Sequence, residues 1–330
     1  MNPFFTSRRR LARAAVAAAG IAAGLGAAAP ALALDSVKIL IPANPGGGWD
    51  STGRALGAAM QGANAVKSVQ YDNKGGAAGT IGLAQFVNTA KGDPNALMIG
   101  GMVMVGGIVA SGSPVNLSMV TPIARLTTEY EVIVVPGNSP IKSMKELVEK
   151  LKANPGSVSW GGGSAGGTDH ILAAMIAKSA GLAASKVNYV PFKGGGDAVA
   201  SIIGGHVTAG ISGFSEFEQH IQSGKMRAIG ISSPAREQGI DVPTLKEQGI
   251  DVELANWRGV FAAPGISAAQ RDELIRTVKA GVDSPAWQKT LKEKNWTGVW
   301  LPGDAYGAYI QKDTARITEI LSELGMVKKK

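Results

Sequence analysis

The sequence predicts an α/β protein whose sheets are mostly parallel and are flanked by helices. Two observations support this class. Short apolar segments alternate with longer helical segments from Val37 almost to the C-terminus, and such alternation is typical of α/β folds with parallel strands. In addition, glycine-rich loops follow four of the predicted strands. In open α/β sheets these loops gather outside the carboxyl ends of the strands, where ligands bind.

The first of these junctions shows the pattern most clearly. Residues 37–42 form an apolar run that is too short for most helices and ends at a proline, so they are predicted to be a buried strand. Three consecutive glycines follow within residues 44–50, and a helix is predicted from Asp50. Glycine allows backbone amides to approach a ligand closely, and a helix N-terminus leaves N–H donors unpaired. The junction favours an anion, but a tight connection with Asp50 as the helix N-cap explains the same residues.

The junction recurs at residues 73–80, 160–170 and 192–197. A further helix is predicted after Ser143, which forms a capping box with Glu146, and it ends before Pro155. The predicted strands are 37–42, 67–71, 96–101, 131–136, 157–160, 187–191, 207–212, 227–231 and 257–262. The predicted helices are 50–62, 79–90, 142–153, 168–181, 196–204, 215–223, 267–281, 285–294 and 304–324.

The first 33 residues are predicted to be a signal peptide. Arg8, Arg9 and Arg10 precede an apolar run rich in alanine, and Ala31-Leu32-Ala33 resembles a cleavage site. The sequence around Arg8 and Arg9 also fits a twin-arginine signal, and the general secretory route and the twin-arginine route both remain open. The sequence therefore predicts export to the periplasm.

Charge and composition exclude several classes of protein. The predicted leader contains four arginines and no acid, so its removal changes the net charge from +8 to +4 (8 − 4). A nearly neutral body argues against nucleic-acid binding. The chain has no cysteine, and neither a nucleotide-binding P-loop nor metal-ligand spacing of its three histidines is found. We expect no cofactor and no metal.

The chain is long enough for two domains. The predicted strand 131–136 ends in a cluster of breaker residues, Pro136-Gly-Asn-Ser-Pro140, where the chain can pass into a second lobe. A return crossing is predicted near residues 251–258. These crossings predict one lobe from residues 35–134 plus 255–330 and another from residues 135–254.

Several motifs together resemble the periplasmic solute-binding proteins of tripartite tricarboxylate transporters. The matching stretches, which span nearly the whole mature chain, are PGGGWD at 45–50, GTIGLAQFV at 79–87, GDPNALM at 92–98, TPIARL at 121–126, SWGGGSAGGTDH at 159–170, DVPTLKEQG at 241–249 and NWRG at 256–259. The resemblance implies a two-lobed periplasmic-binding-protein fold, similar to type II, whose cleft closes on a carboxylated solute. It also implies a monomer that delivers this solute to a large and a small membrane subunit.

The resemblance also implies a set of ligand-binding residues, which come from loops of both predicted lobes. They are Pro45, Gly46, Gly47, Gly48, Trp49, Asp50, Gly76, Ala77, Gly79, Thr80, Gly163, Ser164, Gly167, His170, Lys193, Gly194, Gly195 and Arg258. The Trp49-Asp50 pair resembles the citrate-type branch of the family, although dicarboxylates are also compatible. Ala78 stands where glycine is common in the family, and an alanine at a position that needs positive φ would be costly.

Within this set, the residue types suggest different roles. Asp50 would repel an anion that it faced, so we expect it to fix the first loop, whereas Ser164 is expected to donate its hydroxyl to the ligand. Arg125 and Arg258 either bind a carboxylate directly or form structural ion pairs. Trp257 is expected to pack in the core or in the cleft floor, because a carboxylate offers no aromatic face for stacking.

One enzymatic alternative remains. Residues 162–166 (GGSAG) match the G-x-S-x-G nucleophile elbow of α/β hydrolases, with a strand before them and a helix after them. The catalytic histidine would have to be His170, His206 or His220, yet His170 lies in the helix that follows Ser164, and this fold usually places its histidine late in the chain. The sequence therefore predicts a binding protein rather than an enzyme.

Overall fold

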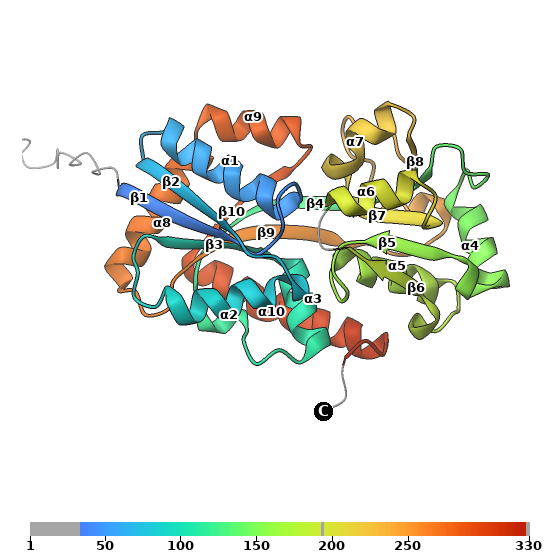
Figure 1. Ribbon diagram of the computed structural model, residues 1–330, viewed down its shortest axis with the longest axis horizontal. Helices are drawn as coiled ribbons and strands as arrows, with labels where there is room; N and C mark the ends of the chain where they lie inside the picture. Colours follow the sequence, from blue (N-terminus) through green and yellow to red (C-terminus); the bar gives the residue numbers. More distant parts are fainter. Residues whose placement is uncertain (1–33, 193–194, 328–330) are drawn as a thin grey trace, which may run out of the picture. The chain divides into compact units, whose positions relative to one another are not determined.

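The computed structural model describes residues 34–192 and 195–327 (Figure 1). The predicted signal peptide, residues 1–33, lies outside the described residues. The described part contains ten strands and ten α-helices, which confirms the predicted α/β class. The strands are β1 Leu34–Ile41, β2 Val66–Asn73, β3 Ala96–Gly101, β4 Thr121–Pro136, β5 Ser159–Gly162, β6 Asn188–Pro191, β7 Ala209–Gly213, β8 Met226–Ile231, β9 Ala255–Ala262 and β10 Thr297–Pro302.

Helices connect most of these strands. The α-helices are α1 Gly48–Gly62, α2 Thr80–Thr89, α3 Met102–Ser111, α4 Met144–Ala153, α5 Thr168–Ser179, α6 Gly195–Ile203, α7 Phe214–Gln222, α8 Ala268–Val282, α9 Pro285–Glu293 and α10 Gly303–Glu323. Short 3-10 helices lie at η1 Ala77–Gly79, η2 Leu117–Met119, η3 Pro155–Ser157, η4 Ala184–Lys186 and η5 Lys246–Gln248.

The strands form a mixed sheet in the order β2-β1-β3-β9-β4-β7-β5-β6, and β8 and β10 also pair with β4. The outer strands follow the predicted parallel pattern, since β1 is parallel to β2 and β3, and β5 is parallel to β6 and β7. The two long strands β4 and β9 enter antiparallel to their neighbours. Antiparallel insertion places the start of β9 beside the carboxyl end of β3, where Arg258 pairs with Gly101.

Strand β4 changes partners along its length. Its residues 121–130 pair with β9, and part of this segment also pairs with β10. Its residues 131–136 pair with β7 and β8. We call the group of β1, β2, β3, β9, β10 and residues 121–130 the first sheet, and the group of residues 131–136 with β5 to β8 the second sheet. The partner change falls near the predicted lobe boundary at 134/135, and the division into lobes itself stays a prediction.

Helices cover both faces of the first sheet. Figure 1 shows α1 and α9 on one side of β1 to β3, and α2 and α10 on the other. Helix α1 packs against α8 and α9, and α3 packs against α10. The side chains between these layers, such as Ile39, Ile41 and Leu56, are fully buried, and burial of one such side chain contributes about 1.5 to 3 kcal/mol. This packing fixes the ends of β1 and β3 relative to α1.

Two elements were not predicted. Helix α3 follows β3 directly, and its sequence, MVMVGGIVAS, has no polar face, because it is packed against several other elements; an amphipathic period is therefore absent. Strand β10 carries mixed residues at the edge of the first sheet and pairs with β4 alone among the described strands. Strand β4 also begins ten residues earlier than predicted, at Thr121 rather than Glu131, because polar residues such as Arg125 and Thr127 interrupt its apolar pattern.

No helix in residues 34–192 and 195–327 combines the length and hydrophobicity needed to cross a membrane.

Candidate ligand-binding site

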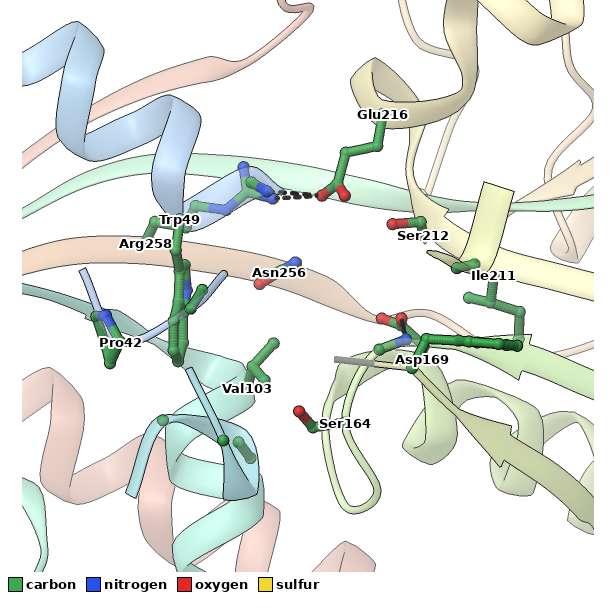
Figure 2. Close-up of a pocket in the computed structure, with 18 residues that line it drawn as sticks. Pro42, Trp49, Val103, Ser164, Asp169, Ile211, Ser212, Glu216, Asn256 and Arg258 are labelled. Atoms are coloured by element: carbon green, nitrogen blue, oxygen red, sulfur yellow. Dashed lines mark hydrogen bonds and ion pairs between the residues drawn. The ribbon is translucent and has the colours of Figure 1, made fainter. Parts of the chain in front are cut away.

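A cavity of about 110 Å³ lies where the loops of the first sheet meet those of the second (Figure 2). Most of its lining residues lie in the loops and first helical turns that follow the carboxyl ends of strands, as the recurring glycine junctions predict, whereas Ile211, Ser212, Asn256 and Arg258 lie within β7 and β9. The cavity is lined by Pro42, Ala43, Gly48, Trp49, Gly76, Ala78, Gly79, Val103, Gly163, Ser164, Asp169, Phe192, Ala198, Ile211, Ser212, Glu216, Asn256 and Arg258.

The cavity brings together part of the predicted site. The predicted residues that line it are Gly48, Trp49, Gly76, Gly79, Gly163, Ser164 and Arg258. The predicted residues that stand beside it, in the same loops but not in its lining, are Pro45, Gly46, Gly47, Asp50, Ala77, Thr80, Gly167 and His170. Lys193 and Gly194 lie outside the described residues, and α6 begins at Gly195. The role of each of these residues in binding stays a prediction.

Asp50 organises the first loop. Its Oδ2 accepts a hydrogen bond of 3.0 Å from the Gly46 amide, and its Oδ1 accepts bonds of 2.9 Å from both Arg54 and Asn73. Burial raises the pKa of the Asp50 carboxyl, but the hydrogen bonds from Arg54, Asn73 and Gly46 outweigh it and hold that pKa below its ordinary value. Asp50 thus has the geometry expected of a residue that fixes the loop, and the Gly46 amide is directed to Asp50.

We expect Asp50→Ala to lower the free energy of unfolding by about 1 to 3 kcal/mol, because it leaves the Gly46 and Asn73 donors without their acceptor. Because the folded-state pKa is lowered, this loss should be fully present above the unfolded pKa of about 4 and should shrink as the pH falls through the folded value. Urea unfolding of the variant at several pH values measures it. Asp251→Ala, which removes an exposed carboxylate, is the control. An unchanged stability would contradict the role of Asp50.

The second loop has an unusual backbone. Four consecutive residues have positive φ: Gly76 (128°), Ala77 (46°), Ala78 (53°) and Gly79 (86°). A left-handed conformation costs an alanine about 1 to 2 kcal/mol. The Ala78 methyl group is buried and packs against Gly107 of α3, where any Cβ would collide with it. Ala78 thus has the positive φ that is costly for alanine, and Gly107 of α3 leaves the space that its methyl group occupies.

The loop from the second sheet is held by its own side chains. The Gly163 amide donates to Asp169 Oδ2 (2.5 Å), and the Gly166 amide donates to His170 Nδ1 (3.1 Å). The imidazole ring also stacks on Tyr189, with centroids 4.3 Å apart. Burial lowers the pKa of His170 to about 4, so the ring is neutral at physiological pH. His170 therefore supports the loop that carries Ser164.

A buried cluster of charges stands behind and beside the cavity. Arg258, only 1% exposed, lies with Nη1 2.6 Å from Glu129 Oε2 and with Nη2 3.7 Å from Glu216 Oε1. Glu216 Oε1 also accepts a 3.1 Å hydrogen bond from the Gly48 amide at the start of α1. This bond joins α7, next to the second sheet, to α1, next to the first sheet.

The acids of this cluster outnumber its cation. Desolvation raises the pKa of Glu216 to about 7 and the pKa of Asp169 to about 6, and it raises the pKa of Glu131 well above its ordinary value. Arg258 opposes these increases by its positive charge. The second side of the cavity is therefore acidic, which the sequence alone did not indicate.

Four polar lining residues were absent from the predicted set: Asp169, Ser212, Glu216 and Asn256. Asp169 and Asn256 lie within motifs that carry the family resemblance, so their positions were marked but their roles were not assigned. Glu216 is in the first turn of α7, directly after β7. A fifth strand-to-helix junction was therefore present in the predicted elements, but a single glycine, Gly213, precedes the helix there.

Arg125 and Trp257, which the sequence analysis also considered, have structural roles. The Arg125 guanidinium lies over the Tyr309 ring, 4.5 Å from its centroid, and donates to Thr128 Oγ1. Trp257 is fully buried, and its indole N–H donates to Asp313 Oδ2 at 2.7 Å. Packing of Trp257 in the core agrees with the prediction. Arg258 forms the ion pair considered for it and also lines the cavity, and its direct binding of a carboxylate stays a prediction.

Comparison with known proteins identifies the family. A family model described as the tripartite tricarboxylate transporter family receptor, TctC, matches residues 55–326. The chain belongs to the TctC receptor family. It is similar to the protein BugT of Bordetella pertussis, with 27% identity over 315 residues that cover 94% of this chain and 95% of BugT.

Solved structures show the same fold. The periplasmic binding protein BugD superposes with a TM-score of 0.79 and 24% identity, over 89% of this chain and 99% of BugD. MatC from Rhodopseudomonas palustris, solved with bound malate, has a TM-score of 0.77 and 20% identity, over 87% of this chain and 99% of MatC. At these identities the superpositions establish the fold. This TctC family receptor thus has the fold of periplasmic solute-binding proteins, as predicted.

Proposed function

We propose that this TctC family receptor captures a carboxylate solute in the periplasm and delivers it as a monomer to the large and small membrane subunits of a tripartite tricarboxylate transporter. The observation that carries the proposal is the cavity itself, which lies at the N-terminus of α1 and between loops of both sheets. Amide donors at a helix N-terminus favour anions. MatC, which shares the fold, holds malate, and this supports a carboxylate as the ligand class.

The proposed lobes, residues 35–134 plus 255–330 and residues 135–254, close on the solute. The hydrogen bond between Gly48 and Glu216 supports this proposal, because opening the cavity would break it. The ligand candidates suggested by the resemblance are a tricarboxylate such as citrate and, as a second choice, a dicarboxylate. The acids that line the cavity disfavour the most highly charged of these candidates.

A thermal-shift screen of the mature protein against di- and tricarboxylates tests the proposal, because a ligand that binds only the folded state raises the melting temperature by mass action. We expect at least one carboxylate to raise it, while the matching neutral amide does not. Equal shifts from a carboxylate and its amide would contradict anion binding. An ester-turnover assay on the same sample tests the hydrolase alternative.

The geometry around Ser164 supplies no support for that alternative. In the described residues no hydrogen bond joins Ser164 Oγ to a histidine, and the Nδ1 atom of His170 accepts from the Gly166 amide. A nucleophilic serine needs a base within hydrogen-bond reach. Ester turnover that disappears in a Ser164→Ala variant would nevertheless establish the enzyme.

We expect Ser164→Ala to weaken carboxylate binding by about 1 to 3 kcal/mol, the typical cost of losing a hydrogen bond to a charged group. Ser164 lines the cavity from the second side, so folding stability should change little. Calorimetric titration beside thermal melts measures both quantities. The control is Ser185→Ala, a residue outside the cavity lining. Normal binding by the Ser164→Ala variant would remove Ser164 from the site.

A further inference from the structure

The two sides of the cavity differ in chemistry. On the side of the first sheet it is lined by the α1 N-terminus and the loop at residues 76–79. On the opposite side, two carboxylates, Asp169 from α5 and Glu216 from α7, belong to the lining (Figure 2). The first side suits an anionic group of a ligand, whereas the second side suits a cationic one.

The buried cation does not neutralise this acidic side. Arg258 is the only cationic residue among the described residues of the lining. Its closest partner is Glu129 of β4, at 2.6 Å, whereas Glu216 is 3.7 Å away. Glu131 lies two residues further along β4 and adds a third acid near Asp169 and Glu216. One buried cation therefore faces several acids, and burial raises the pKa of Asp169 and Glu216, so a positive group of a ligand beside them would favour their ionised forms.

Four buried polar atoms of the lining have no hydrogen-bond partner in the described part of the chain. Two are Nε and Nη1 of Arg258, whose charge is paired with Glu129. The other two are Oδ1 of Asn256, a residue only 5% exposed, and Nε1 of Trp49, a residue only 7% exposed. In Figure 2, Asn256 points into the space between Arg258 and Asp169. Unpaired buried polar groups are costly, so a ligand that supplies a donor to Asn256 and an acceptor to Trp49 would be stabilised by both.

The acids are not arranged as a metal site. Among the described residues no group of three or more histidine, cysteine, aspartate or glutamate side chains has the geometry to hold a metal ion. A positive group on the ligand would complement Asp169 and Glu216. An ammonium group fits, because it also donates hydrogen bonds to carboxylate and amide oxygens.

We propose that the ligand is a zwitterion, a carboxylate that also carries a protonated amino group, whose ammonium group binds between Asp169, Glu216 and Asn256 Oδ1 while its carboxylate faces the α1 N-terminus. This inference rests on the proposed carboxylate-binding function and narrows its ligand class. A ligand with a second or third carboxylate in place of the ammonium group would instead be repelled by the two acids.

Matched ligands that differ in one group provide the test. Succinate, malate and aspartate share one carbon skeleton and carry hydrogen, hydroxyl or ammonium at C2; 2-hydroxyglutarate and glutamate form the matching five-carbon pair. We expect the amino member of at least one skeleton to bind about tenfold or more tightly than its hydroxy partner in calorimetric titration. Equal or tighter binding of the hydroxy acid overturns the zwitterion and leaves the carboxylate function standing. If no acid of either skeleton binds but ethanolamine does, the carboxylate function fails as well.

Charge-removing variants test whether Asp169 and Glu216 cause the preference for the amino acid over the hydroxy acid. Asp169→Asn and Glu216→Gln keep the size of each side chain and remove one negative charge. Each should reduce the ratio of amino-acid to hydroxy-acid affinity severalfold, mainly by weakening the amino acid. Glu149→Gln removes an equal charge from an exposed position of α4 and should leave the ratio unchanged. A ratio that stays constant in both cavity variants overturns the assignment of the acids, whatever the absolute affinities.

Proton exchange gives an independent measurement. The groups that face Asp169 are Glu129, Glu131, Arg258 and the Tyr189 hydroxyl. Those that face Glu216 are Glu129, Glu131, Asp169 and Arg258. An added ammonium group favours the ionised acids, so binding should release protons, whereas an added carboxylate would cause proton uptake. Titration at one pH in buffers of different ionisation enthalpy distinguishes the two signs. Net proton uptake with the tightest ligand would contradict the proposal.

Discussion

Arg258→Met is expected to lower the free energy of unfolding by about 3 to 5 kcal/mol, the usual cost of removing one partner from a buried ion pair. The guanidinium is 1% exposed and faces Glu129 at 2.6 Å and Glu216 at 3.7 Å. Without it, Glu129 is left as a buried, uncompensated carboxylate. Ser215 would still donate to this carboxylate through its amide and hydroxyl, but these dipoles do not replace a full charge.

The loss of stability in Arg258→Met should depend on pH and on whether Glu129 keeps its carboxylate. Removal of the cation favours protonated acids, so the destabilisation should be smaller near about pH 5 than near about pH 8. In the Arg258→Met/Glu129→Gln double variant, most of the loss should be recovered, because a buried pair replaced as a whole is often close to neutral in stability.

The control for this comparison is Arg236→Met. Arg236 is also paired with two acids, Glu247 at 2.9 Å and Asp241 at 3.3 Å, but its side chain is 50% exposed. An exposed pair contributes about 0 to 1 kcal/mol. Urea unfolding of the four proteins measures the differences. If Arg258→Met cost no more than Arg236→Met, the buried charge cluster would not be a determinant of stability.

The sequence was sufficient for features that depend on local chemistry. The strand, glycine loop and helix at residues 37–62 appear in the predicted order. However, α1 begins at Gly48 with Gly47 as its N-cap, so Asp50 lies within the first turn and is not the N-cap. The Ser143 cap also allowed the start of α4 to be predicted within two residues, and the hydrogen bond from the Glu146 amide to Ser143 Oγ is present. The predicted capping box is incomplete, because the Glu146 carboxylate accepts from the Lys142 amide rather than from the Ser143 amide. In these segments the same residues determine both the pattern and the structure.

Features that depend on contacts between distant segments were not predictable in this way. Helix α3 has no polar face because other elements cover it. The positive φ of Ala78 is tolerated because Gly107, 29 residues away (107 − 78), makes room for its methyl group. The acidic side of the cavity requires four elements, β4, α5, α7 and β9, to bring Glu129, Asp169, Glu216 and Arg258 together. The spacing of these residues along the chain does not show that they lie together in the fold.

The second large effect that we expect is a gain in stability. Glu131→Gln should raise the free energy of unfolding by about 1 to 3 kcal/mol at about pH 8, because the folded variant no longer has to bind a proton, or bury a charge, at this position. Glu131 is fully buried on β4, and neither of its carboxyl oxygens has a hydrogen-bond partner among the described residues. Burial, together with the charges of Asp169 and Glu129, raises its pKa well above the ordinary value.

The sign of the pH dependence follows from this raised pKa. The folded state retains a proton on Glu131 that the unfolded state releases above its pKa of about 4.3, so the wild-type protein loses stability as the pH rises from there towards the folded value. The Gln variant has no such proton. Its advantage over wild type should therefore be smallest at about pH 4 and should grow with pH.

Urea unfolding of wild type and Glu131→Gln at several pH values between about 4 and 8 tests this expectation. Glu149→Gln, in which the replaced carboxylate is exposed, should show no growing advantage. A Glu131→Gln variant that is less stable than wild type throughout this range would mean that the ionised carboxylate has a stabilising partner in the folded protein. A gain that increases with pH would instead show that Glu131 is retained at the expense of stability, next to the acids that we assign to the ligand.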